Sequence, residues 1–195
     1  AMEEISKIDS SVSVIMSVNN SLVCYGIEAF CTEEQKEKWL KPLARGEKIG
    51  AFLLSEPEAG SDATSQRTMA VDMGDHYLVN GVKNWITNGK NADTYFVQAM
   101  TDKSKGHKGI STFLIDKDAE GLETGLKEDK LGIRSSDTCT VSFNNCRVHK
   151  DQLLGGEGLG FKIAMETLNG GRIGIAAQAL GIAQASLEAA TKYAK

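Results

Sequence analysis

The sequence contains no long apolar run and no cluster of basic residues. Its longest apolar runs, such as Ile173–Leu180, are interrupted by Gly and Gln and fall short of the about 18 residues that a membrane span needs. The first nine residues carry acidic side chains and no apolar stretch, unlike a signal peptide. The 22 basic and 26 acidic residues are spread along the chain. We therefore expect a globular protein with no membrane span and no nucleic-acid partner.

Cysteine, histidine and proline are scarce as well. The three histidines show neither metal-ligand spacing nor a credible catalytic arrangement. Six residues separate Cys24 from Cys31 and Cys139 from Cys146, which fits neither a CxxC motif nor a zinc finger. We expect free thiols in a reducing compartment and no metal. Two disulfides or a four-cysteine metal site are the alternatives.

The N-terminal quarter has helical periodicity. Apolar residues recur at spacings of three and four over 2–24, which predicts one amphipathic helix. Thr32 followed by Glu33, Glu34 and Gln35 has the form of a capping box with an acidic first turn. The second predicted helix runs over 33–44 and ends at Gly46.

The region from about 49 to 148 is rich in short β-prone runs. Asn80-Gly81 lies between two of them, a pattern typical of a two-residue hairpin. Further predicted strands cover Trp85–Thr87, Tyr95–Thr101, Ile110–Asp116 and Thr138–Phe143. With no helix between the strands, we expect an antiparallel sandwich or barrel flanked by helices, an α+β fold.

The C-terminal region begins with a glycine-rich stretch over 155–160 and continues as a predicted helix to Lys195. The stretch has no GxGxxG register and no following Lys-Ser/Thr, so we interpret it as a tight turn into the helix. Gly174 and Gly181 lie seven apart on nearly one helical face. Because glycine costs about 1 kcal/mol in a helix, we expect a close helix contact there. Neither end of the chain carries a clear cap, so we expect a segment of a longer protein; a frayed natural terminus is the alternative.

Three features invite a functional interpretation. Ser55–Asp62 combines Pro57 with small residues whose backbone amides can bind an anion; a polar turn is the alternative. Trp85 and Thr87 point to one face of a strand, either as a platform for a planar cofactor or as core residues. Arg172 interrupts an apolar helix and must pair with a carboxylate or meet an anionic ligand.

Together these features resemble the acyl-CoA dehydrogenase family along nearly the whole chain. The signatures are LSEPEAGSD at 54–62, NWITNG at 84–89, GLGF at 158–161 and GRIG at 171–174. The runs KEDKLGIR at 127–134 and AQALGIA at 177–183 look most like the short-chain, butyryl-CoA branch. The resemblance implies the end of an N-terminal helical domain (1–46), a middle β-domain that binds flavin and acyl-CoA (47–150), and the start of a C-terminal helical domain (151–195).

The resemblance also implies site residues. FAD would contact two segments, namely Phe52, Leu53, Leu54, Ser55, Gly60 and Ser61 together with Trp85, Ile86 and Thr87. Trp85 would pack on the flavin ring, and Thr87 would bond near its reactive nitrogen. The acyl-CoA would contact Ser61, Asn169, Gly170, Gly171 and Arg172. The family usually has Asp where Asn169 stands, so a charge is missing from that contact.

The implied reaction is FAD-dependent α,β-dehydrogenation of a short-chain acyl-CoA, with electrons passed to an electron-transfer flavoprotein. The catalytic Glu is expected beyond Lys195, and Gly171 occupies the position that carries it in some other branches. We therefore expect this segment alone to be inactive. The resemblance further implies a homotetramer in the bacterial cytoplasm or the mitochondrial matrix, with the cytoplasm slightly favoured.

Two other functions fit the same residues. An acyl-CoA oxidase shares the fold and would give its electrons to oxygen. A non-catalytic flavin- or CoA-binding module would lack the base altogether.

Overall fold

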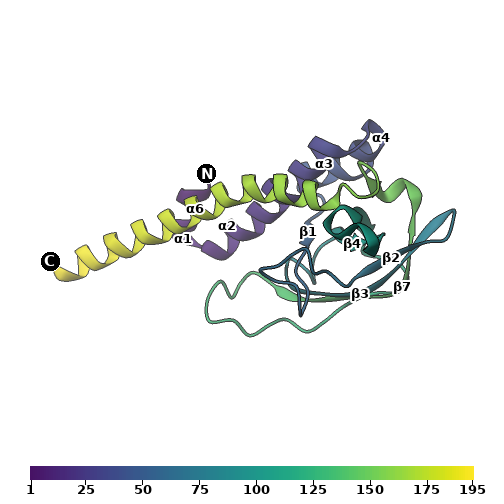
Figure 1. The fold of residues 1–195 in the computed structure, drawn as a ribbon. Helices are drawn as coiled ribbons and strands as arrows, with labels where there is room; N and C mark the ends of the chain where they lie inside the picture. The colour runs from purple at the N-terminus through teal and green to yellow at the C-terminus, as the bar shows by residue number, and fades with distance from the viewer.

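A computed structural model describes residues 1–195 (Figure 1). Along the sequence, helices occupy the N-terminal quarter and the C-terminal end, and the strands of the sheet come between them. The helical segments are α1 (Met2–Ile8), α2 (Ser10–Ser17), η1 (Val18–Cys24), α3 (Tyr25–Phe30), α4 (Glu33–Gln35), η2 (Lys36–Leu40), α5 (Lys41–Ala44), η3 (Lys103–Gly109), η4 (Lys150–Gln152) and α6 (Gly160–Ala194). Two short helical segments, η3 and η4, lie between strands, and two more, η1 and η2, continue the N-terminal helices.

The middle region forms one eight-stranded sheet. Its strands are β1 (Gly50–Leu53), β2 (Met69–Asp72), β3 (His76–Thr87), β4 (Thr94–Met100), β5 (Ile110–Asp116), β6 (Leu122–Thr124), β7 (Thr138–His149) and β8 (Leu153–Leu154). The order is β6-β7-β3-β2-β4-β5-β8, and β1 pairs with β4. Most pairs are antiparallel, but β1 runs parallel to β4 and β2 meets β4 through one parallel bridge. The α+β class is confirmed, with this parallel pairing as the departure from a purely antiparallel sheet.

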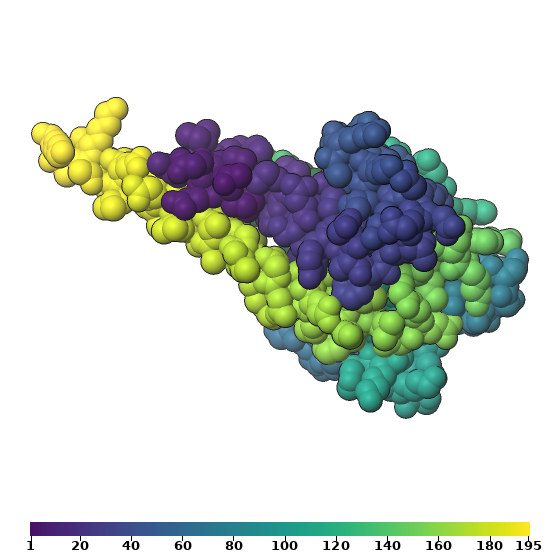
Figure 2. Space-filling model, turned by 90° about the horizontal axis from the view of Figure 1, so that it is seen from above, coloured from purple at the N-terminus to yellow at the C-terminus, as the bar shows by residue number.

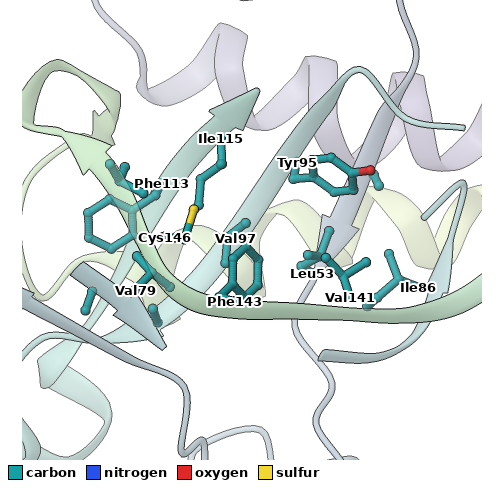
Figure 3. Packing of buried hydrophobic residues seen from close by; sticks show 14 of the residues in the cluster. Leu53, Val79, Ile86, Tyr95, Val97, Phe113, Ile115, Val141, Phe143 and Cys146 are labelled. Carbon is teal, nitrogen blue, oxygen red and sulfur yellow. The ribbon is translucent and has the colours of Figure 1, made fainter. Parts of the chain in front are cut away.

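The sheet encloses the main hydrophobic core. Side chains of β3 and β7 meet those of β4 and β5 across the interior (Figure 3). The Tyr77 and Phe113 rings, for example, pack edge to face with centroids 4.9 Å apart. Cys139 and Cys146 are buried in this core, and all four cysteines are free thiols, as expected. The two halves of the sheet therefore pack face to face, as in a sandwich.

The predicted hairpin at Asn80-Gly81 is wrong. Both residues lie within the continuous strand β3, which pairs with β7 along its length. The pairing shifts register between Val79 and Gly81, so a bulge takes the place of a turn. Gly81 has φ 150°, and a Cβ there would lie 2.6 Å from the Thr68 Cα. The glycine is needed because the neighbouring chain passes directly over it.

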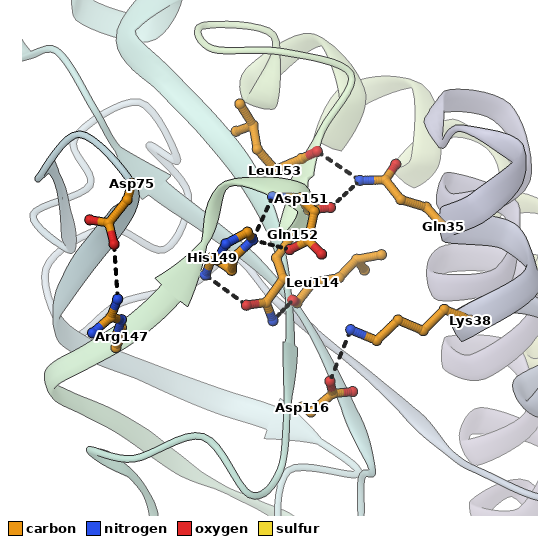
Figure 4. Close-up of polar contacts among 10 residues, drawn as sticks. All are labelled: Gln35, Lys38, Asp75, Leu114, Asp116, Arg147, His149, Asp151, Gln152 and Leu153. Carbon is orange, nitrogen blue, oxygen red and sulfur yellow. Dashed lines mark hydrogen bonds and ion pairs between the residues drawn. The ribbon is translucent and has the colours of Figure 1, made fainter.

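The N-terminal helices dock on the β-region through a second hydrophobic cluster and through polar contacts. The predicted single helix over 2–24 is interrupted at Asp9, whose extended backbone ends α1 and whose side chain caps α2. The capping box of Thr32 and Gln35 is confirmed. Gln35 Nε2 also donates to the Asp151 and Leu153 carbonyls at 2.6 and 2.9 Å (Figure 4). The cap therefore also joins the helices to the end of the sheet.

α6 packs against the N-terminal helices along a row of glycines. A Cβ on Gly181 would lie 2.3 Å from the Glu3 carbonyl oxygen, and one on Gly174 would lie 2.8 Å from Ser17 Oγ. The predicted close helix contact is thus confirmed. The C-terminal part of α6 projects beyond the rest of the molecule (Figure 2). Along its length the helix leaves apolar side chains such as Ile173 and Leu187 exposed.

α6 also has the length and composition of a membrane-spanning helix, with a mean hydropathy of 1.2 over its most apolar window. The sequence predicts no membrane span here, because Gly and Gln interrupt the apolar run. One such helix is weak support for a span, since core helices of globular proteins meet the same criteria. The glycine contacts with α1 and α2 explain its small-residue face without a membrane.

Candidate functional site

The two main signatures lie side by side at one end of the sheet. The backbone N–H of Asn84 donates to the Ser55 carbonyl at 2.9 Å. Asn88 Nδ2 donates to the Gly50 carbonyl at 3.1 Å. Direct hydrogen bonds therefore hold β1 and the segment that follows it against the C-terminal end of β3. Residues 52–61 and 85–87, predicted to share one ligand, belong to adjoining segments.

Trp85 is exposed at a second bulge of β3. The pairing with β7 shifts between Lys83 and Ile86, and Trp85 adopts φ 61°. The bulge breaks the strand alternation, so 64% of the Trp85 surface remains exposed while Ile86 is buried in the core. The interpretation of Trp85 as a core residue is wrong. An open indole face at the end of a sheet is instead suited to stacking on a planar group.

Two of the nine predicted cofactor contacts have side chains that face away from solvent. Leu53 and Ile86 both belong to the main core. Only their backbone groups can reach a ligand. Phe52, Leu54, Ser55 and Thr87 are half-buried, and Gly60 and Ser61 are exposed.

The loop between β1 and β2 presents free backbone donors. The N–H groups of Gly60, Ser61 and Asp62 donate to no other group of the protein. The Asp62 carboxylate instead caps the next turn by accepting from Ser65 Oγ and from Thr64 Oγ1, at 2.5 and 2.6 Å. These bonds, with that from Ser65 the strongest, lower the Asp62 pKa. The loop is thus shaped by its own carboxylate and leaves its amides available to an anion.

Asn84 adds an unpaired acceptor near the indole. Its side-chain Oδ1 is buried and accepts no hydrogen bond, although buried acceptors are nearly always paired. A donor group on a bound ligand would satisfy it. The exposed indole, the free amides and this acceptor together fit a planar, hydrogen-bonding cofactor that carries phosphates.

A buried ion pair beneath this loop was missed from the sequence. Lys83 Nζ lies 2.8 Å from Glu56 Oε1, and their side chains are only 0% and 4% exposed. Burial lowers the Lys83 pKa to about 8, and Glu56 offsets part of that effect. Burial alone would raise the Glu56 pKa, but Lys83 and hydrogen bonds from Arg67 and Thr68 outweigh it and lower it. Each of the two groups therefore favours the charged form of the other.

Strand alternation was the signal that could have revealed Lys83. Tyr77 and Val79 point into the core, and Lys83 continues the same inward-facing series along β3. A lysine at an inward position requires a buried partner. Glu56, inside the first signature, is that partner.

The predicted substrate contacts on α6 form a separate group. Arg172 is exposed, makes no ion pair, and its guanidinium donates only to Asn169 Oδ1. The structural ion pair considered for Arg172 is thus absent, and most of its donors are free. No hydrogen bond joins this group to Ser55 or Trp85. η1 packs against both α6 and β1.

A small apolar cavity of about 270 Å³ lies next to Arg172, where α6 meets α2 and η1. Leu22, Leu168, Gly171 and Ile175 line it. Gly171 is buried, and a Cβ there would lie 2.7 Å from Leu22 Cδ2. The cavity can accept a short apolar chain next to a free guanidinium.

Comparison with known proteins places this arrangement in a family. Models of the acyl-CoA dehydrogenase N-terminal, middle and C-terminal domains match residues 1–47, 51–146 and 158–195. The chain belongs to the acyl-CoA dehydrogenase family.

Relatives point to one branch of that family. The chain is 54% identical to the mouse mitochondrial short-chain specific acyl-CoA dehydrogenase, over all of this chain and 47% of that protein. It is 53% identical to the short-chain specific enzyme of Clostridium acetobutylicum, over all of this chain and 52% of that protein. These relatives include both mitochondrial and bacterial proteins.

Solved structures agree. Butyryl-CoA dehydrogenase from Megasphaera elsdenii matches with a TM-score of 0.97 and 51% identity, over 98% of this chain and 50% of that one. A chain in a structure described as an electron transferring flavoprotein of Acidaminococcus fermentans matches with the same TM-score and 56% identity, over 98% and 50%. The chain therefore spans about half the length of the relatives it matches.

Proposed function

We propose that the full-length protein is an FAD-dependent dehydrogenase of short-chain acyl-CoA thioesters that passes its electrons to an electron-transfer flavoprotein. The exposed Trp85, joined through Asn84 to the Ser55 loop, carries this proposal. Relatives named short-chain specific acyl-CoA dehydrogenases and butyryl-CoA dehydrogenase support the substrate. The likeness to the A. fermentans structure supports the partner.

The residues of this chain would bind and orient. Trp85 offers its open face to the flavin ring, and the amides of Gly60 and Ser61 donate to phosphate oxygens. Arg172 offers free donors to the acyl-CoA, and the cavity beside Gly171 takes the acyl chain. FAD, when bound, would supply the chemistry of accepting a hydride from the β-carbon.

The α-proton needs a base that this chain does not place. Gly171 has no side chain, and no carboxylate lies among the cavity residues. We therefore assign proton removal to a carboxylate in the part of the protein beyond Lys195. The chain alone should orient the substrate without oxidising it, and the complete protein should form a homotetramer in either the bacterial cytoplasm or the mitochondrial matrix.

Purification of the full-length protein tests the cofactor. We expect a yellow protein that releases FAD on denaturation and whose flavin is bleached by butyryl-CoA under anaerobic conditions. A colourless protein that takes up no FAD on reconstitution would refute the proposal. Electron-transfer flavoprotein as acceptor should support turnover without peroxide; peroxide as the main product would show an oxidase instead.

Substitution of Trp85 tests the platform. Trp85→Ala should weaken FAD binding by about 1–3 kcal/mol if the stacking resembles that of bases on aromatic side chains. Trp39→Phe is the matched control, because Trp39 is buried and its Nε1 donates to Asp116 at 3.0 Å, away from the loop. Full FAD affinity in Trp85→Ala would remove the stacking role.

A further inference from the structure

The loop Leu54–Thr68, which links β1 to β2, is held from beneath by one buried lysine. Lys83 Nζ donates to the Leu54 carbonyl at 3.1 Å, to Glu56 Oε1 at 2.8 Å and to Gln66 Oε1 at 2.8 Å. All three ammonium donors are thereby used. Leu54 and Glu56 belong to the start of the loop and Gln66 to its end, so a single side chain ties the two ends together.

Glu56 completes the closure from the other side. Its Oε2 accepts from the backbone N–H of Arg67 at 2.6 Å, and its Oε1 accepts from that of Thr68 at 3.1 Å. The carboxylate therefore bonds both to Lys83 and to the two residues that lead into β2. The residues between, including Ser55 and Ser61, are held between two fixed ends.

This pair differs from the other ion pairs of the molecule. In each of the others at least one side chain is half exposed or more. Burying two charges brings little net stability, because desolvation offsets their attraction, and apolar residues of similar volume are often as stable. Stability alone therefore gives no reason to place charges here. Their hydrogen bonds do fix the loop, which apolar side chains could not do.

The same strand segment carries the candidate platform. Lys83 fixes the loop, Asn84 donates to the Ser55 carbonyl, and Trp85 presents its exposed face. Three consecutive residues of β3 thus set the position of the loop relative to the indole.

We propose that Lys83 and Glu56 are positioning residues that hold the 54–68 loop at a fixed place relative to Trp85 and so set the affinity for the flavin. This inference rests on the proposed function. Neither side chain is exposed enough to touch a ligand, so both act through the loop backbone and through Ser55. Gln66, buried and bonded to Lys83, is the third member of the group.

The test uses three variants of the full-length protein. Lys83→Met removes the charge and all three hydrogen bonds. Lys83→Met combined with Glu56→Leu replaces the pair by apolar side chains, which keeps the core packed if the single variant folds poorly. Ile115→Ala is the matched control, because Ile115 is fully buried in the main core but belongs to β5, outside the loop and outside the hydrogen bonds that hold it.

Two quantities are measured for each variant that folds. They are the FAD dissociation constant, by titration, and the hydrogen-exchange rates of the Arg67 and Thr68 amides. Both Lys83 variants should weaken FAD binding at least about tenfold, or 1.4 kcal/mol, and should speed exchange of the two amides. Ile115→Ala should lower stability but leave both readouts at wild-type values. A purely structural role predicts that the apolar double variant, once folded, binds FAD as the wild type does.

The outcomes separate this inference from the proposed function. Wild-type FAD affinity in either folded Lys83 variant would overturn the positioning role while leaving the dehydrogenase proposal intact. A wild-type protein that takes up no FAD would overturn the dehydrogenase proposal and with it the link to flavin. Amide exchange would then still show whether Lys83 holds the loop, and unchanged exchange in Lys83→Met would refute that as well.

Discussion

Two glycines of α6 allow a sharp test of how this helix meets the sheet. Gly160, the first residue of α6, is buried against β5: a Cβ there would lie 2.6 Å from the Ser111 carbonyl carbon and 2.8 Å from the Ile110 carbonyl oxygen. Gly170 lies ten residues further along the same helix. The nearest atom to a Cβ at Gly170 is the Ser21 carbonyl oxygen at 3.8 Å, an ordinary contact.

The two substitutions to alanine should therefore have opposite signs. Gly160→Ala forces a methyl group into the backbone of β5, which cannot move aside because it pairs with β4. Overpacking of this kind costs about 1–3 kcal/mol. Gly170→Ala makes only an ordinary van der Waals contact with the Ser21 carbonyl oxygen and gains up to about 1 kcal/mol of helix propensity. The two variants should differ by about 1–4 kcal/mol in the free energy of unfolding, although both make the same chemical change.

Thermal unfolding of the full-length protein, followed by circular dichroism, measures the difference. Gly160→Ala should lower the midpoint by several degrees, and Gly170→Ala should raise it slightly or leave it unchanged. A Gly160→Ala protein as stable as the wild type would show that α6 does not approach β5 this closely. A destabilised Gly170→Ala protein would show instead that a covered surface lies over that position.

Three further outcomes follow from the caps, the thiols and the buried carboxylate. Thr32→Ala removes the acceptor of the Gln35 N–H and should cost about 0.5–2 kcal/mol in chemical denaturation; unchanged stability would contradict the cap. Burial raises the pKa of Cys139 and Cys146 to about 11, and both thiols lie in the main core, so a disulfide reagent should label these two only after unfolding; labelling of either in the native protein would argue against its burial. The Glu56 pKa is lowered in the folded protein, because Lys83 and hydrogen bonds from Arg67 and Thr68 outweigh the effect of burial, so its stabilisation is fully present above the unfolded pKa and is lost as the pH falls through the folded pKa. Glu56→Gln should flatten this acid decline, and a wild-type slope in the variant would refute it.

Local chemistry made part of the fold predictable. The capping box of Thr32 and Gln35 depends on side chains three residues apart, and the structure has both of its hydrogen bonds. The contact surface of α6 followed from Gly174 and Gly181 because their spacing places them on one helical face. The short strands between polar turns indicated a sheet with a packed interior. In each case the residues that determine the local structure lie close together in the sequence.

Long-range contacts account for what the sequence did not predict. Lys83 lies 27 residues from Glu56 and 17 from Gln66, and nothing local indicates that they meet. The Asn80-Gly81 pair has the chemistry of a hairpin, but Gly81 is required by Thr68 passing over it. Because β3 pairs with β7 on both sides of these residues, the structure has a bulge there where the sequence predicted a hairpin turn. Pairing across the sheet overrides the local preference at each of these positions.

Trp85 shows most clearly that this end of the sheet is arranged for something other than stability. A bulky residue at φ 61° stores about 1–3 kcal/mol of backbone strain, and its indole is 64% exposed. A regular strand that buried the same ring in the core would avoid both the backbone strain and the exposed apolar surface. The bulge that prevents it is fixed by its neighbours, since Lys83 and Ile86 are buried on either side. The backbone strain and the exposed apolar surface therefore fall on the residue whose open face a planar cofactor would cover. Binding of that cofactor would bury the exposed surface.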